Sequence, residues 1–156
     1  MAFEKFKKRR AAELERRKIR SDRVKLLLLE RGLSVFSKFG VCKVIVFGSV
    51  ADGVCSEMSD IDILVMPLKN SQYWDFRYEL EEAVDLPIDL YTDLDDPIMV
   101  EKIISRGETL YEVWVWTFKS RVAKKFPVTV KKFKVPITDF LKKLEQVAKK
   151  RGIGIG

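Results

Sequence analysis

The chain has 156 residues and a net charge of +7; it is 47% hydrophobic and 34% charged, and it contains two cysteines and no histidine. This length allows one domain with its own core. The absence of histidine excludes Ser-His-Asp triads and His-ligated metal sites, and two cysteines are too few for a disulfide framework or a zinc site of their own. No apolar run reaches the roughly 20 residues of a membrane helix, and the N-terminus lacks the apolar core of a signal peptide. We therefore expect a cytoplasmic protein with no membrane contact.

The charge is unevenly distributed along the chain. Residues 1–31 contain 12 Lys or Arg and 5 Asp or Glu, residues 32–112 contain 6 and 16, and residues 113–156 contain 12 and 2. An acidic centre therefore lies between two basic flanks. Such flanks suit a polyanionic partner, such as RNA, DNA or an acidic protein surface. Solvated lysine-rich surfaces would give the same pattern, and charge alone does not separate the two interpretations.

The N-terminal flank has a helical composition. Residues 2–20 contain no glycine or proline, are rich in helix-forming residues and have few apolar positions, so we predict an exposed basic helix. Ser21 and Asp22 form a capping pattern that predicts a second helix over residues 23–30, which Gly32 ends.

Strand and helix patterns alternate through the centre of the chain. Apolar and β-branched runs predict strands over residues 41–47, 60–66, 86–92 and 110–118. Helical spacing and capping residues predict a short helix at 49–51 and longer helices over 71–84 and 97–106, and Gly107 ends the last one. Beyond these elements, residues 128–135 fit an edge strand and residues 139–150 fit an amphipathic helix.

This succession predicts an α+β domain with an α/β-like order of elements. We expect a mixed sheet of four or five strands with helices packed on it. The chain would divide into a basic helical N-terminal extension at 1–20, a central domain at 21–118 and a basic C-terminal extension at 119–156 with its amphipathic helix.

A glycine and a serine directly follow the first predicted strand. Gly48 lets the backbone turn and lets a phosphate approach closely. The hydroxyl of Ser49 and the free N–H groups of a starting helix can bind phosphate oxygens. Taken alone, a Gly-Ser pair after a strand is most often only a turn.

Three aspartates lie in strands that are otherwise apolar. Asp60 and Asp62 are one residue apart in the second strand, and Asp89 interrupts the third. Side chains alternate across a strand, so Asp60 and Asp62 face one side while Ile61 and Ile63 face the core. The wet face of a half-exposed strand would explain this pair. If the third strand neighbours the second, however, three carboxylates meet, and without histidine they favour Mg²⁺ or Mn²⁺.

The order Gly-Ser, ten residues, Asp-x-Asp and a later aspartate resembles the nucleotidyltransferases of the DNA-polymerase-β-like superfamily. The segments FGSVADG and SDIDILV closely resemble the minimal nucleotidyltransferase (MNT) subgroup, and RGETLYE resembles the end of that domain. The resemblance covers about residues 22–112. It implies that residues 21–118 form a nucleotidyltransferase domain whose palm-like sheet binds an NTP with magnesium.

The resemblance also implies a role for each site residue. Gly48 and Ser49 would contact the triphosphate, and Asp60 and Asp62 would hold the metal ions. Asp89 would complete the second metal site and help to activate the attacking hydroxyl. The enzyme would then move an NMP from an NTP to a hydroxyl on a protein or nucleic acid and release pyrophosphate.

Two alternatives to catalysis stay open. MNT relatives often work with a separate helical HEPN partner, so the chain would instead be an antitoxin-like module that binds and masks such a partner. Many relatives have arginine where this chain has Asp52, whose negative charge would repel a triphosphate if it pointed inward. The basic flanks would alternatively make the chain a nucleic-acid-binding module. Since the domain has no substrate-binding lobe of its own, the acceptor would come from a partner, a homodimer mate or the flanks.

Overall fold

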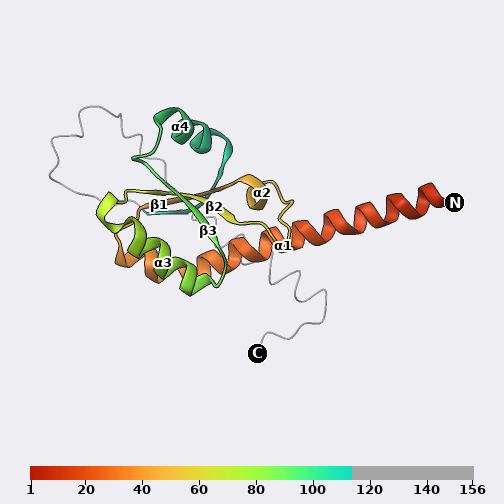
Figure 1. Ribbon diagram of the computed structural model, residues 1–156, viewed down its shortest axis with the longest axis horizontal. Helices are drawn as coiled ribbons and strands as arrows, with labels where there is room; N and C mark the ends of the chain where they lie inside the picture. Colours follow the sequence, from red (N-terminus) through yellow and green to blue (C-terminus); the bar gives the residue numbers. More distant parts are fainter. Residues whose placement is uncertain (114–156) are drawn as a thin grey trace. The chain divides into compact units, whose positions relative to one another are not determined.

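The computed structural model describes residues 1–113 (Figure 1). Its elements, in chain order, are α1 (Ala2–Lys38), β1 (Lys43–Phe47), α2 (Gly48–Ala51), β2 (Ile61–Met66), a turn of 3₁₀ helix η1 (Asn70–Gln72), α3 (Tyr73–Val84), β3 (Ile88–Thr92), α4 (Pro97–Arg106) and β4 (Glu108–Glu112). The predicted α+β class is confirmed. The predicted strand at 128–135 and the helix at 139–150 lie outside the described residues, and no helix within residues 1–113 is long and apolar enough to cross a membrane.

The four strands form one mixed sheet in the order β3-β2-β1-β4. Strand β1 is antiparallel to both of its neighbours, and β2 is parallel to β3. The register places Val44 opposite Val65 on the antiparallel side. On the parallel side it places Asp62 beside Asp89. The strands β2 and β3 are therefore adjacent in the sheet, although η1 and α3 lie between them in the chain.

Helices cover the two faces of the sheet unequally. The larger core cluster lies between the sheet and the helices α1 and α3, and includes Phe36, Ile63 and Leu80. The helix α4 lies on the opposite face (Figure 1). There Ile103 packs against Ile45 and Leu64 in a smaller cluster. On this face Phe47 of β1, Asp62 of β2 and Asp89 of β3 are only half-buried.

The N-terminal helix differs from the prediction of two helices. α1 runs unbroken from Ala2 to Lys38, so the predicted cap at Ser21 and Asp22 and the predicted stop at Gly32 are wrong. The buried hydroxyl of Ser21 donates to the carbonyl of Arg17 and accepts from the N–H of Cys55, which fixes α1 to the loop before β2 instead of starting a helix. A Cβ at position 32 would lie 2.8 Å from the ring of Phe36 in α1 and 3.3 Å from the side chain of Leu80 in α3, so glycine lets the two helices pack closely there.

The N-terminal half of α1 extends past the sheet (Figure 1). Residues 2–16 are all exposed, as predicted for a basic helix without a core face, and the buried positions of the helix begin at Ser21. At its other end the described chain returns to α1. Lys25 is buried, with 7% of the residue exposed, and its ammonium contacts the carboxylate of Glu108 on β4 at 2.6 Å.

Candidate active site

The turn after β1 is built around a glycine that no other residue can replace without strain. Gly48 has φ +66°, in the left-handed region that favours glycine, and it begins α2. A Cβ built at this position would overlap the carboxylate of Asp62 on the neighbouring strand. The Asp62 carboxylate therefore lies against the bare backbone of the Gly48 turn. The sequence placed a turn here, and the structure adds the reason for the missing side chain.

Two of the predicted aspartates are lateral neighbours. Asp62 on β2 and Asp89 on β3 are paired in register across the parallel strands. The flanking Ile61 and Ile63 belong to the core beneath α1 and α3, so both aspartates are on the opposite, α4-bearing face. Asp60 precedes β2 and is exposed. The strands β2 and β3 are adjacent, as the prediction of a shared carboxylate site required.

The charges of these carboxylates act on one another. Burial, and then the negative charges of Asp89 and Asp60, raise the pKa of Asp62 above its ordinary value. Like charges that oppose ionisation in this way are relieved by a cation placed between them. The electrostatics of the site therefore favour a positively charged ligand.

A tyrosine that the sequence argument overlooked supports the third aspartate. The hydroxyl of Tyr91 donates to Asp89 Oδ2 at 3.4 Å, and its ring meets that of Phe47 edge to face at 5.3 Å. Burial and the charge of Asp89 raise the pKa of Tyr91, so its hydroxyl keeps its proton for this contact. The signal was the spacing of two residues from Asp89, which puts both side chains on one face of β3.

The carboxylates do not form a closed metal cage by themselves. Within residues 1–113, no group of three or more His, Cys, Asp or Glu side chains is close enough together to hold a metal ion. The adjacent pair of Asp62 and Asp89 nevertheless fits Mg²⁺, which proteins commonly bind through one or two carboxylates and the phosphates of a substrate. All donors of the pair are oxygens, the atoms that magnesium and manganese prefer.

A pocket of about 710 Å³ opens beside the Gly48 turn, between α2 and α4. Two basic residues line it, Lys102 and Arg106, which are one turn apart on α4. Asp52 and Asp96 line it as well, but the carboxylate of Asp96 caps α4 by accepting from two backbone N–H groups. The remaining lining residues are Phe47, Gly48, Ala51, Ile98, Met99 and Ile103. Sequence reasoning missed the two cations, although their i, i+4 spacing after a well-marked helix start was visible.

Comparison with known proteins identifies a family. The model of a family described as "Polymerase beta, Nucleotidyltransferase" matches residues 33–113. No curated protein matches the chain. Similar solved structures include a toxin-antitoxin with AMP-PNP (16% identity over 79% of this chain and 91% of that one, TM-score 0.47). Another is a tri-AMPylated Shewanella oneidensis HEPN toxin in complex with MNT antitoxin (15%, 82% and 92%, TM-score 0.43).

Proposed function

Because the chain belongs to the polymerase-β nucleotidyltransferase family, we propose that it is a magnesium-dependent enzyme that transfers an NMP from an NTP to a hydroxyl acceptor and releases pyrophosphate. One observation carries the proposal: the Gly48 turn, Asp62 and Asp89 meet at one point on the open face of the sheet. A phosphate-binding turn beside paired carboxylates is the arrangement that metal-assisted nucleotidyl transfer requires.

The chain's own residues would bind and orient the triphosphate. Gly48 and Ser49 would offer backbone N–H groups and a hydroxyl to phosphate oxygens at the start of α2. Lys102 and Arg106, in the adjoining pocket, would offset the remaining negative charge. Asp52 lines the same pocket and opposes this effect, so the two cations on α4 take over the role that a basic residue at position 52 would have.

The aspartates would hold the metal. Asp62 and Asp89 are the adjacent pair, and the exposed Asp60 would join them once phosphate oxygens occupy the site. Bound Mg²⁺ or Mn²⁺ would stabilise the entering and leaving oxygens of an in-line displacement at the α-phosphorus. Asp89 would also accept the proton of the acceptor hydroxyl, and Tyr91 would keep that carboxylate in position.

The experiment compares label transfer with metal binding. We expect full-length protein to transfer label from α-phosphate-labelled NTPs to a component of a lysate of its host, with protease and RNase digestion showing whether the acceptor is protein or RNA. Asp62→Asn and Asp89→Asn should lower labelling by about 100-fold and weaken Mn²⁺ binding measured by electron paramagnetic resonance. Asp75→Asn, which changes an exposed residue of α3, is the control, and equal labelling by Asp62→Asn would refute the site.

A masking role is the alternative that Asp52 favours, because this acidic residue lines the pocket where a triphosphate would bind. On that alternative, the chain is an antitoxin-like module that inhibits a HEPN-type partner by binding it. A stable partner that stays inhibited by a variant lacking Asp60, Asp62 and Asp89 would favour masking over transfer.

A further inference from the structure

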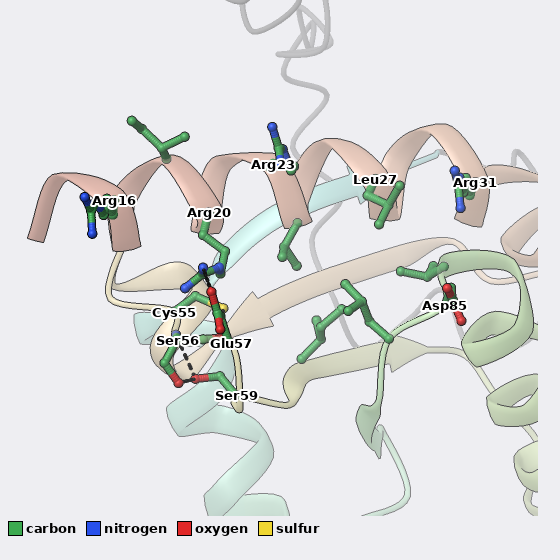
Figure 2. A pocket seen from close by; sticks show the side chains of 15 residues that line it. Arg16, Arg20, Arg23, Leu27, Arg31, Cys55, Ser56, Glu57, Ser59 and Asp85 are labelled. Atoms are coloured by element: carbon green, nitrogen blue, oxygen red, sulfur yellow. Dashed lines mark hydrogen bonds and ion pairs between the residues drawn. The ribbon is translucent and has the colours of Figure 1, made fainter. Parts of the chain in front are cut away.

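A second groove lies where α1 passes the beginnings of β2 and β3 (Figure 2). It has a volume of about 600 Å³, and its lining comes from one side of α1, from the loop before β2 and from the segment that joins α3 to β3. None of the residues assigned above to the nucleotide or the metal lines it. The groove is therefore separate from the candidate active site, and the two share no lining residue.

The two walls of the groove carry opposite charges. Along α1 stand four arginines, Arg16, Arg20, Arg23 and Arg31, whose spacings of four, three and eight residues keep them on one side of the helix. The facing wall holds Glu57 and Asp85. Arg20 and Glu57 are joined across the groove at 2.7 Å (Figure 2). None of the ion pairs formed among residues 1–113 includes the other three arginines.

The floor between these walls is apolar. The half-buried Leu27 of α1 and Leu86 before β3 line it, above the buried side chain of Ile61. No aromatic side chain is among the lining residues of the groove. The site thus combines an apolar floor with an arginine wall, which are the two components that anchor protein helices in grooves.

We propose that this groove docks an amphipathic α-helix of a partner protein, with the apolar stripe of that helix on the floor and its acidic residues toward the arginines of α1. From Arg16 to Arg31 the wall is about 22 Å long at 1.5 Å per residue, which matches about four turns of a docked helix. This docking is independent of nucleotide binding and goes beyond the proposed transfer activity.

The chemistry favours such a helix over the other occupants of a basic groove. Single-stranded nucleic acid binds through bases stacked on aromatic rings, which this lining lacks. A second copy of α1 would bring more positive charge to the arginine wall. An acidic, apolar-striped helix satisfies both the wall and the floor.

A charge-swap experiment tests the proposal on the full-length chain. The probe is a fluorescein-labelled synthetic helical peptide of four turns, with leucines at i, i+3, i+4 and i+7 and glutamates along one flank. We expect the double substitution Arg23→Glu and Arg31→Glu to weaken its binding, measured by fluorescence anisotropy, by about 10-fold or more. Arg9→Glu with Arg10→Glu makes the same charge change at exposed positions of α1 outside the groove, and should change binding by less than about 3-fold.

Two further probes make the result decisive. A peptide with lysines in place of the glutamates should bind the Arg23→Glu, Arg31→Glu variant more tightly than the unsubstituted chain, a reversal that unfolding of the variant cannot produce. A mixed-sequence single-stranded RNA is the rival ligand. Tight binding of RNA that is lost in the groove variant but not in the control would overturn the proposal in favour of nucleic acid. The proposal would also be overturned if both double variants weakened peptide binding equally, or if the peptide did not bind the unsubstituted chain.

Discussion

Gly48 and Gly40 share a left-handed backbone but have different surroundings. Their φ angles are +66° and +69°, yet a Cβ at position 40 meets nothing within 4 Å, whereas one at position 48 overlaps the Asp62 carboxylate. We predict that Gly40→Ala lowers the free energy of unfolding by about 1 kcal/mol through backbone strain alone. Gly48→Ala should cost about 2–4 kcal/mol, because the clash adds to the strain.

Urea denaturation of the two variants measures this difference. Gly48→Ala should also weaken Mn²⁺ binding, since the added methyl group displaces Asp62, while Gly40→Ala should bind the ion normally. Equal destabilisation by the two substitutions would show that the Asp62 carboxylate does not lie against the turn.

The raised pKa of Asp62 has a consequence for stability against pH. Burial and the charges of Asp89 and Asp60 oppose its ionisation in the folded state. The folded chain therefore binds more protons than the unfolded chain between the two pKa values, and the carboxylate destabilises the fold above that window. In EDTA, Asp62→Asn should melt at a higher temperature than the unsubstituted chain at pH 7, and the difference should vanish as the pH falls below about 4.

Thermal melts at several pH values test whether Asp62→Asn raises the melting temperature at pH 7 and loses this effect at low pH. Glu82→Gln, which removes an exposed charge from α3, is the control and should show no such pH-dependent gain. A lower melting temperature for Asp62→Asn at pH 7 would mean that the carboxylate is stabilised in the fold, contrary to its surroundings. Added Mg²⁺ should reduce the advantage of the asparagine variant.

The sequence predicted which side chains of a strand face the core. It did not predict which residues of other elements lie beside them. A period of two placed Ile61 and Ile63 on the core side of the strand and Asp62 on the other, as the core confirms, whereas Asp60 precedes β2. Tyr91, Lys102 and Arg106 escaped notice because their relevance comes from tertiary proximity. Their spacing in the sequence was visible, but a tyrosine in a strand and two basic residues on a helix gain a meaning only once β3 and α4 are known to lie beside the Gly48 turn.

At the scale of elements, local signals succeeded where the residues act locally. The helix predicted over residues 97–106 matches α4, because Asp96 caps it, Pro97 starts it and Gly107 ends it, all through nearby backbone groups. The prediction failed in α1, where Ser21 and Gly32 resemble a cap and a stop. Both residues serve contacts with distant segments, Cys55 for the serine and Leu80 for the glycine. A propensity argument cannot distinguish a helix boundary from a close packing contact within a helix.

At the scale of the whole molecule, the strand order depends on contacts that no local pattern specifies. The alternation of helices and strands predicted a mixed sheet, but not that β4 would flank β1 or that β3 would occupy the opposite edge. The adjacency of β2 and β3 entered the sequence argument only as a condition. The separate roles of the N-terminal extension, the domain and the C-terminal extension stay predictions.

One ion pair ties the first helix to the last described strand. The ammonium of Lys25, on the buried side of α1, contacts the half-exposed carboxylate of Glu108 at 2.6 Å. Removing the carboxylate leaves a nearly buried cation without its partner, a loss that exceeds the value of an exposed pair. We predict that Glu108→Ala lowers the free energy of unfolding by about 1–3 kcal/mol.

A double-mutant cycle separates the cost of the stranded cation from the worth of the pair. Lys25→Met with Glu108→Ala should recover most of the stability lost in Glu108→Ala, because methionine fills the same space without a charge. Glu13→Ala removes an exposed partner of Arg17 within α1 and should cost less than about 0.5 kcal/mol. If Glu108→Ala costs no more than Glu13→Ala in urea denaturation, Lys25 is solvated and does not hold α1 against β4.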